Sequence, residues 1–224
     1  MSPLHRRGPV FYASLPCDSD GSSAHQADRE KARCRLVAIL WEHLVTMEGR
    51  LRGGDLLSSH KASLPVHLIR DPLGKPHLML GKHPGPAVSF SQGGGAVWAA
   101  LCEDESGIGI DVAGSDEFAA QYPVSRVFAP QEVQQAMHWA GGDMGRAAAL
   151  LWSVKEAAVK AMGCGFHLVE PRDICIQPGV VRGGECIFAV GLSDKGLERL
   201  PMAAGRAIWV YSVPLARMWL SVAS

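Results

Sequence analysis

Apolar residues recur at steps of three and four in two long segments, 26–48 and 144–162, and this spacing is typical of helices with one buried face. The apolar stripe of the first segment consists of Leu36, Ile39, Leu40, Leu44 and Met47. The stripe of the second consists of Ala147, Leu150, Leu151, Val154, Ala158 and Ala161. Gly49, Gly53 and Gly54 are expected to end the first helix. Asp143 and Gly163 are expected to cap the two ends of the second.

Alternating apolar and polar residues, or short apolar runs between turn residues, predict strands elsewhere in the chain. The expected strands are 10–15, 66–69, 78–80, 87–91, 96–102, 107–112, 174–177, 186–190, 207–213 and 218–222, and shorter helices are expected at 130–139 and 194–200. In the strand 107–112, Asp111 alternates with Ile108 and Ile110, so its side chain is expected on the face opposite theirs. This alternation predicts a half-buried strand.

The order of these elements bounds the fold class. Strands and a long helix come first, then more strands, two helices and a last group of strands. This order predicts an α+β fold built from two similar subdomains, 1–112 and 113–224, related by a pseudo-twofold axis. A cleft between two such subdomains is the expected place for an active site.

Composition and charge narrow the function classes. Apolar residues make up 47% of the 224 residues, and 22 basic residues balance 22 acidic ones. This excludes a disordered chain and argues against a nucleic-acid binder, which usually carries a basic excess. The longest uncharged run, 84–102, is broken by glycines and prolines, so no membrane span is expected. The six cysteines form no CxxC pair, and reduced thiols in a cytoplasmic protein are expected.

The candidate chemistry comes from one strand and one helix. Asp111 lies in the strand of sequence GIGIDV, and the segment WSVKEAAVK places Trp152, Glu156 and Lys160 four residues apart on one helical face. Lys155 lies beside that face. Two carboxylates with lysines nearby suit a magnesium ion that carries a phosphorylated substrate, because magnesium prefers oxygen ligands and needs only one or two protein carboxylates. Each element alone also has a purely structural explanation, since a glutamate and a lysine at this spacing form an ion pair on any exposed helix.

Taken together, the two segments resemble the 4'-phosphopantetheinyl transferases, in particular the larger, surfactin-synthetase-activating type. That family pairs a G-[IV]-D-[IV] strand with a W-[ST]-x-K-E-[AS]-x-x-K helix, and both patterns are present here. Weaker agreements extend the resemblance over about residues 66–170, and they are GKP at 74–76, AVSFS at 87–91, RVFAPQE at 126–132 and GCG at 163–165.

The resemblance implies an enzyme that uses coenzyme A and Mg2+. Such an enzyme moves the 4'-phosphopantetheine arm onto a serine hydroxyl of an apo acyl or peptidyl carrier protein and releases adenosine 3',5'-bisphosphate. It also implies a monomer, because one chain supplies both halves of the site. Whether the carrier serves fatty-acid, polyketide or nonribosomal-peptide synthesis is left open.

The resemblance also assigns roles to individual residues. Asp111 and Glu156 are the expected Mg2+ ligands, and Glu156 is also the expected base for the serine proton. Lys160 is expected to neutralise the pyrophosphate. The residues expected to bind coenzyme A are Lys75, Gln92, Lys155 and Arg35.

Two departures from the family pattern keep an alternative open. The family often has a third acidic ligand two residues after the strand aspartate, where this chain has Ala113. The family's S-H-S histidine falls at Gln92, which can donate a hydrogen bond to phosphate but carries no charge. A degenerate, non-catalytic relative that binds coenzyme A or a carrier protein is therefore the alternative, and an unrelated α+β domain with coincidental motifs is a third.

Overall fold

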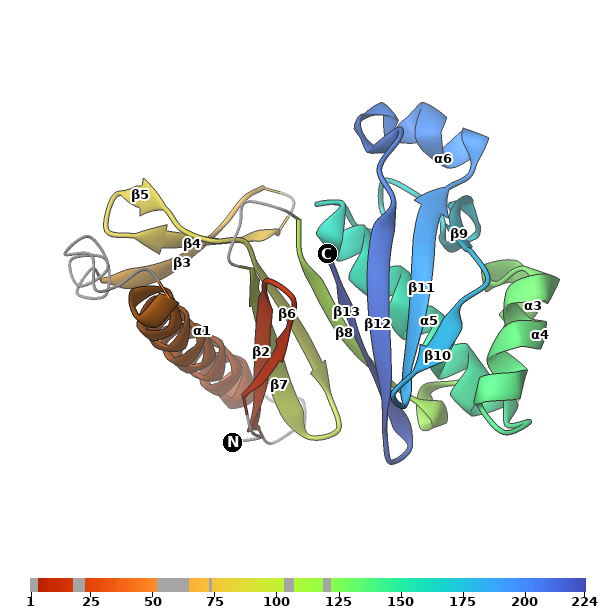
Figure 1. Cartoon of the computed structure of the whole chain (residues 1–224), viewed down its shortest axis with the longest axis horizontal. Helices are drawn as coiled ribbons and strands as arrows, with labels where there is room; N and C mark the ends of the chain where they lie inside the picture. Colours follow the sequence, from red (N-terminus) through yellow and green to blue (C-terminus); the bar gives the residue numbers. More distant parts are fainter. Residues whose placement is uncertain (1–3, 18–22, 52–64, 73, 103–106, 119–121) are drawn as a thin grey trace. The chain divides into compact units, whose positions relative to one another are not determined.

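The chain forms two compact units, Met1–Ser106 and Gly107–Ser224, in a computed structural model that describes residues 4–17, 23–51, 65–72, 74–102, 107–118 and 122–224. Each unit combines antiparallel sheet with a long helix, which places the chain in the predicted α+β class (Figure 1). The division falls ahead of the predicted boundary after Val112, because the strand that carries Asp111 pairs entirely within the second unit.

Unit 1 (Met1–Ser106) contains one four-stranded and one three-stranded antiparallel sheet, with strand orders β1-β2-β7-β6 and β3-β4-β5. Its elements are β1 (His5–Arg7), β2 (Val10–Pro16), α1 (Ser23–Leu51), β3 (Val66–Arg70), β4 (Pro76–Leu80), β5 (His83–Pro84), β6 (Val88–Gly93) and β7 (Ala96–Cys102).

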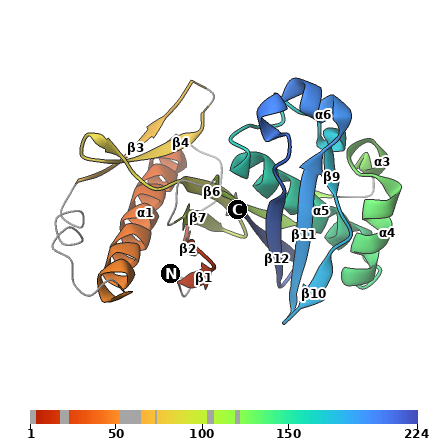
Figure 2. The same cartoon turned by 45° about the horizontal axis from the view of Figure 1, so that its top comes forward.

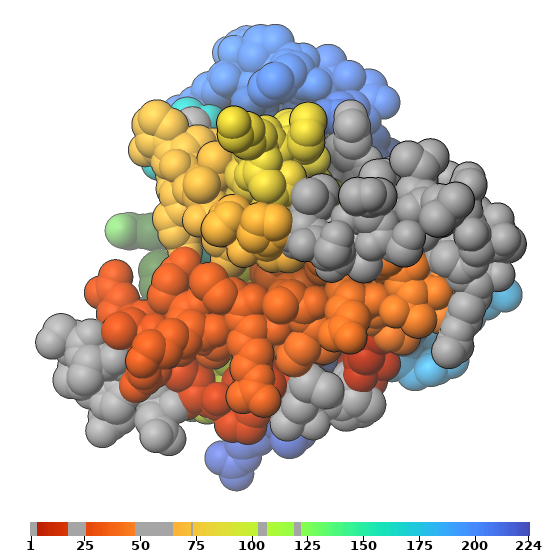
Figure 3. Space-filling model, turned by 90° about the vertical axis from the view of Figure 1, so that its left-hand side faces the viewer, coloured from red at the N-terminus to blue at the C-terminus, as the bar shows by residue number. Residues whose placement is uncertain are grey.

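Helix α1 follows the predicted apolar stripe and packs on β2 and β7. Leu36, Leu40 and Leu44 are buried there, while the opposite side of the helix lies on the surface of unit 1 (Figure 3). The helix continues to Leu51, so the prediction that Gly49 ends it is wrong. A single glycine costs a helix only about 1 kcal/mol, which the packed face upstream outweighs.

Unit 2 (Gly107–Ser224) is built on one sheet of order β10-β11-β12-β13-β8, with β9 paired to β11. Its elements, with η for 3-10 helix, are β8 (Gly109–Gly114), η1 (Ser115–Glu117), α3 (Val124–Val127), α4 (Pro130–Trp139), α5 (Met144–Ala161), η2 (Pro171–Asp173), β9 (Ile174–Ile176), β10 (Val180–Arg182), β11 (Glu185–Leu192), α6 (Asp194–Arg199), η3 (Pro201–Ala203), β12 (Ile208–Leu215) and β13 (Met218–Ala223). Helix α5 lies across β8, β13 and β12, and α4 packs against α5 (Figure 2).

The backbone of helix α5 packs directly against the backbone of β8, because Gly107 and Gly109 have no side chains to separate the two elements. A Cβ atom added to Gly109 would lie 1.8 Å from the carbonyl oxygen of Ala157, and one added to Gly107 would lie 1.9 Å from that of Ala161. All six residues of β8 are buried, and Asp111 lies on the face that α5 covers. The expectation of a half-buried strand is therefore wrong, because α5 covers the face of β8 on which Asp111 lies.

Three buried hydroxyl groups add a second contact between α5 and the sheet. Ser153 Oγ lies 2.7 Å from Ser221 Oγ of β13, which lies 2.7 Å from Ser212 Oγ of β12. Ser221 is also the register partner of Asp111 across β13 and β8. The helix is thus fixed to the sheet beside the strand position that carries the aspartate.

Replacing Gly109 with alanine is expected to lower the free energy of unfolding by about 3 kcal/mol, because the carbonyl that it would meet belongs to the helix backbone and cannot rotate away. Urea unfolding followed by tryptophan fluorescence measures this loss. Gly191→Ala is the matched control, since Gly191 lies in the same sheet and a Cβ atom added there would meet nothing within 4 Å. Its effect is expected to stay within about 1 kcal/mol. Equal losses in the two variants would contradict the close packing of α5 on β8.

The structure also bears on the expectations about membrane spans and cysteines. Among the described residues, no helix is both long and apolar enough to cross a membrane. All six cysteines are free thiols, as the spacing predicts.

Candidate functional site

Asp111, Glu156 and Lys160 come together in unit 2, where β8 and α5 present them to one another. Lys160 Nζ lies 2.7 Å from Asp111 Oδ1 and 3.5 Å from Glu156 Oε2. It also donates a hydrogen bond of 3.1 Å to the carbonyl oxygen of Ile110. The predicted juxtaposition of strand carboxylate and helix face is therefore present, and the lysine ammonium lies between the two carboxylates.

The two carboxylates differ in their surroundings. The side chain of Asp111 is only 9% exposed, whereas that of Glu156 is 24% exposed and that of Lys160 is 28% exposed. Burial raises the pKa of Glu156, Lys160 opposes this, and the negative charge of Asp111 adds to the rise. Two neighbouring carboxylates disfavour each other's ionised form, so a cation placed between them stabilises both ionised forms.

An aromatic cluster borders the same helical face one turn earlier. The ring of Trp152 lies 5.0 Å from that of Phe166 and 6.4 Å from that of Phe118 between centroids. The charged face of α5 therefore borders an apolar cluster on the side of Trp152.

The donor set of the site suits a small divalent cation. Carboxylate oxygens from two rigid elements meet around one point, and the backbone carbonyl of Ile110 faces the same point. Ala113, on the same face of β8 as Asp111, is 1% exposed and supplies no third carboxylate. Among the residues that the structure describes, no group of three or more histidine, cysteine or acidic side chains is placed to hold a metal. Magnesium accepts such a two-carboxylate set, because it usually keeps several waters.

Lys155 is not part of this site. Its side chain is 1% exposed, and its Nζ lies 2.9 Å from Glu132 Oε2. It also donates hydrogen bonds of 2.8 Å and 2.9 Å to the carbonyl oxygens of Pro171 and Ile174. The prediction that Lys155 contacts coenzyme A is corrected by this placement, since an ammonium with these partners is enclosed in the core of unit 2.

Glu132 ends the RVFAPQE segment of the resemblance, but it is not among the predicted site residues. One carboxylate oxygen accepts from the backbone N–H of Ala129, which closes the first turn of α4, and the other accepts from the N–H of Ile176 in β9. Burial lowers the pKa of Lys155, and the adjacent Glu132 opposes that shift. A glutamate at the third position of a helix is a recognisable capping signal, but its partner on α5 is not visible in the sequence.

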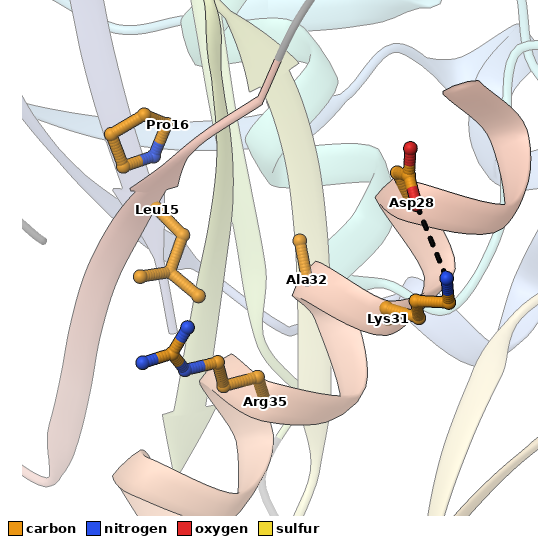
Figure 4. A pocket seen from close by; sticks show the side chains of 6 residues that line it. All are labelled: Leu15, Pro16, Asp28, Lys31, Ala32 and Arg35. Carbon is orange, nitrogen blue, oxygen red and sulfur yellow. Dashed lines mark hydrogen bonds and ion pairs between the residues drawn. The ribbon is translucent and has the colours of Figure 1, made fainter. Parts of the chain in front are cut away.

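Three further predicted residues lie in unit 1, whereas the carboxylate pair lies in unit 2. Lys75 is exposed in the turn that Asp71 closes by accepting from the Lys75 N–H at 2.9 Å. Gln92 is exposed near the end of β6. Arg35 is exposed on α1 and borders a hollow of about 410 Å³ (Figure 4).

The hollow beside Arg35 lies between the end of β2 and the first half of α1. Its lining residues are Leu15, Pro16, Asp28, Lys31, Ala32 and Arg35. Lys31 is engaged with Asp28 at 3.3 Å, whereas the guanidinium of Arg35 extends toward Leu15 and Pro16 (Figure 4). The cavity therefore offers one basic group beside an apolar wall.

A comparison with protein families bears on the carboxylate site. Residues 107–189 match the model of the 4'-phosphopantetheinyl transferase superfamily. The matched segment begins beside the glycines under α5 and includes Asp111, Glu156 and Lys160. The match supports phosphopantetheinyl transfer as the general activity, with coenzyme A and a carrier protein as the partners that the superfamily implies in general. No curated protein matches the chain.

Proposed function

We propose that this protein is a phosphopantetheinyl transferase of the larger, surfactin-synthetase-activating type. It transfers the 4'-phosphopantetheine arm of coenzyme A to a serine hydroxyl of an apo acyl or peptidyl carrier protein. The observation that carries the proposal is the cluster of Asp111, Lys160 and Glu156, which lies inside the segment that matches the superfamily. The protein is proposed to act as a cytoplasmic monomer.

In the proposed reaction, the serine oxygen attacks the phosphorus that carries the pantetheine arm. A new oxygen–phosphorus bond forms, the bond to the bridging oxygen breaks, and adenosine 3',5'-bisphosphate leaves with that oxygen. Glu156 accepts the serine proton as the proposed general base. Lys160 provides positive charge for the phosphate oxygens.

Asp111 and Glu156 would hold Mg2+, which when bound neutralises charge on the pyrophosphate oxygens. Both side chains sit on rigid elements, because α5 is fixed to β8 and β13 by backbone contact and buried hydroxyls. This rigidity keeps the two carboxylates at a constant separation while substrate binds and leaves.

Unit 1 is proposed to supply the contacts to the rest of coenzyme A. Lys75 and Arg35 would bind its phosphates, and Gln92 would donate a hydrogen bond in place of a histidine. We further propose that the two units are related by a pseudo-twofold axis and share the active-site cleft. An uncharged Gln92 predicts weaker binding of coenzyme A than a histidine would give.

A transfer assay tests the proposal. The protein is incubated with coenzyme A, Mg2+ and an apo carrier protein, and the carrier is weighed by mass spectrometry. The expected result is a gain equal to the phosphopantetheine arm, which removal of Mg2+ by a chelator prevents. The assay is repeated with carriers from fatty-acid, polyketide and nonribosomal-peptide synthesis. No transfer to any of them would refute the proposal.

One observation favours a second candidate, a non-catalytic relative. The position of the family's third acidic ligand is occupied by Ala113, which is packed in the core. A non-catalytic relative would bind coenzyme A, as measured by calorimetry, without modifying any carrier. The transfer assay and the binding measurement together separate the two candidates.

A further inference from the structure

We propose that the ammonium group of Lys160 occupies the cation position between Asp111 and Glu156 in the free protein, so that a divalent cation has to displace it. The phosphate groups of coenzyme A draw the ammonium away, and metal and coenzyme A therefore bind cooperatively. This inference rests on the proposed function in one respect, namely that the two carboxylates take a divalent cation.

The geometry around Lys160 Nζ carries the inference. Three oxygen atoms surround the nitrogen, at 2.7 Å from Asp111, 3.1 Å from the carbonyl of Ile110 and 3.5 Å from Glu156. These are the hard oxygen ligands that magnesium prefers, and magnesium needs them at about 2.0–2.1 Å. A cation placed among these three oxygen atoms would overlap the ammonium that already lies there.

The net charge of Asp111, Glu156 and Lys160 also supports the inference. Two carboxylates and one ammonium leave a single net negative charge, which is a weak attraction for a divalent cation. With the ammonium still in place, the bound cation would also be repelled at short range. Phosphate oxygens offer the ammonium an alternative anionic partner, so their arrival lowers the free energy of moving it.

Lys160 is placed to make this movement. It lies in the last turn of α5, and its side chain is 28% exposed, unlike the enclosed Lys155. A lysine carries its charge on a flexible four-carbon stem with freely rotating donors. The ammonium can therefore leave the carboxylates while the helix backbone stays where the glycines of β8 hold it.

Metal binding to the protein without coenzyme A tests the first half of the inference. Calorimetric titration with Mn2+ is compared for the wild type and Lys160→Met, a variant that keeps side-chain length and removes the charge. The variant is expected to bind Mn2+ at least about tenfold more tightly, within the range of coupling factors common between protein sites. Circular dichroism checks its fold, and Lys160→Gln provides a second variant.

Lys195→Met is the matched control. Lys195 pairs with Glu170 at 3.5 Å elsewhere in unit 2, so the control removes the same charge from an exposed ion pair outside the site. Its Mn2+ affinity is expected to equal that of the wild type. Adding Asp111→Asn to Lys160→Met is expected to abolish the gain. Equal Mn2+ affinity in the wild type and both Lys160 variants would overturn the inference.

The second half is tested by repeating the titrations with saturating coenzyme A. Coenzyme A is expected to raise the Mn2+ affinity of the wild type by a larger factor than that of Lys160→Met, and any metal bound by free coenzyme A affects both equally. Equal factors would overturn the cooperative part. The titrations do not depend on turnover. A protein that transfers nothing to any carrier but behaves as expected here would refute the proposed function alone, and the converse result would refute only this inference.

Discussion

Replacing Glu156 with glutamine is expected to slow phosphopantetheine transfer about a thousandfold, which corresponds to about 4 kcal/mol of transition-state stabilisation. Glutamine keeps the shape and one oxygen of the side chain, but it cannot accept the serine proton and is a poorer ligand for a cation. Loss of a positioned base or of an electrostatic contact at a reacting centre each costs a factor of that order. Quantitative mass spectrometry of the carrier over time gives the rate.

Glu198→Gln is the control for this variant. Glu198 is exposed on α6 in the same unit, so its replacement changes the net charge equally and is expected to leave the rate unchanged. Thermal unfolding of both variants checks that the fold is intact. A Glu156→Gln protein that transfers within about tenfold of the wild-type rate would contradict the role of Glu156 as base and ligand.

Replacing Lys155 with methionine is expected to lower the free energy of unfolding by about 4 kcal/mol, because it leaves the Glu132 carboxylate buried without its cation. The carbonyl oxygens of Pro171 and Ile174 lose their donor as well. Urea unfolding followed by circular dichroism measures the change. In the exposed pair of Lys195 and Glu170, Lys195→Met is expected to cost less than about 1 kcal/mol.

A double variant shows whether the loss comes from the ion pair itself. Combining Lys155→Met with Glu132→Leu removes both charges, so the loss is expected to be smaller than the sum of the two single losses by more than about 1 kcal/mol. A Lys155→Met protein as stable as Lys195→Met would refute the structural role of the buried pair. Strict additivity in the double variant would show that the two residues act separately.

The long elements could be predicted from periodicity and end signals, and the carboxylate pair from these together with the resemblance to a known family. The predicted helix over 130–139 and the start of the helix at Met144 agree with α4 and α5, and Asp143 caps α5 by accepting from the Arg146 N–H. Asp111 and Glu156 each follow from the register of one strand or one helix. Their meeting required only that the helix pack on the strand, which the resemblance to a known family implied.

Short elements carry no comparable signal in the sequence. Strands β1, β5 and β10 and helix α3 contain four residues or fewer, so no repeat of apolar positions develops in them. Residues Gly53 and Gly54, expected to help end the first helix, lie outside the described residues. The tight contact under α5 was missed for a different reason, since glycine in a strand gives no indication of what approaches it.

Lys155 shows the limit of reading charge from sequence. A lysine next to a glutamate on a helix is usually exposed, and Lys155 is buried because it pairs with the carboxylate of Glu132 on another helix and donates to two backbone carbonyls. That partner is set by tertiary packing of α4 against α5. Neighbouring helical residues point about 100° apart, so Lys155 and Glu156 face different surroundings despite being adjacent.

The same adjacency constrains how the site can adapt. Turning α5 about its own axis to reposition Glu156 would pull Lys155 away from Glu132 and from two carbonyl oxygens at once. These contacts therefore oppose rotation of α5 about its axis. Glu156 and Lys160 can change position only through their own side-chain torsions. In the proposed reaction, any adjustment to carrier proteins of different shape would therefore come from segments outside α5.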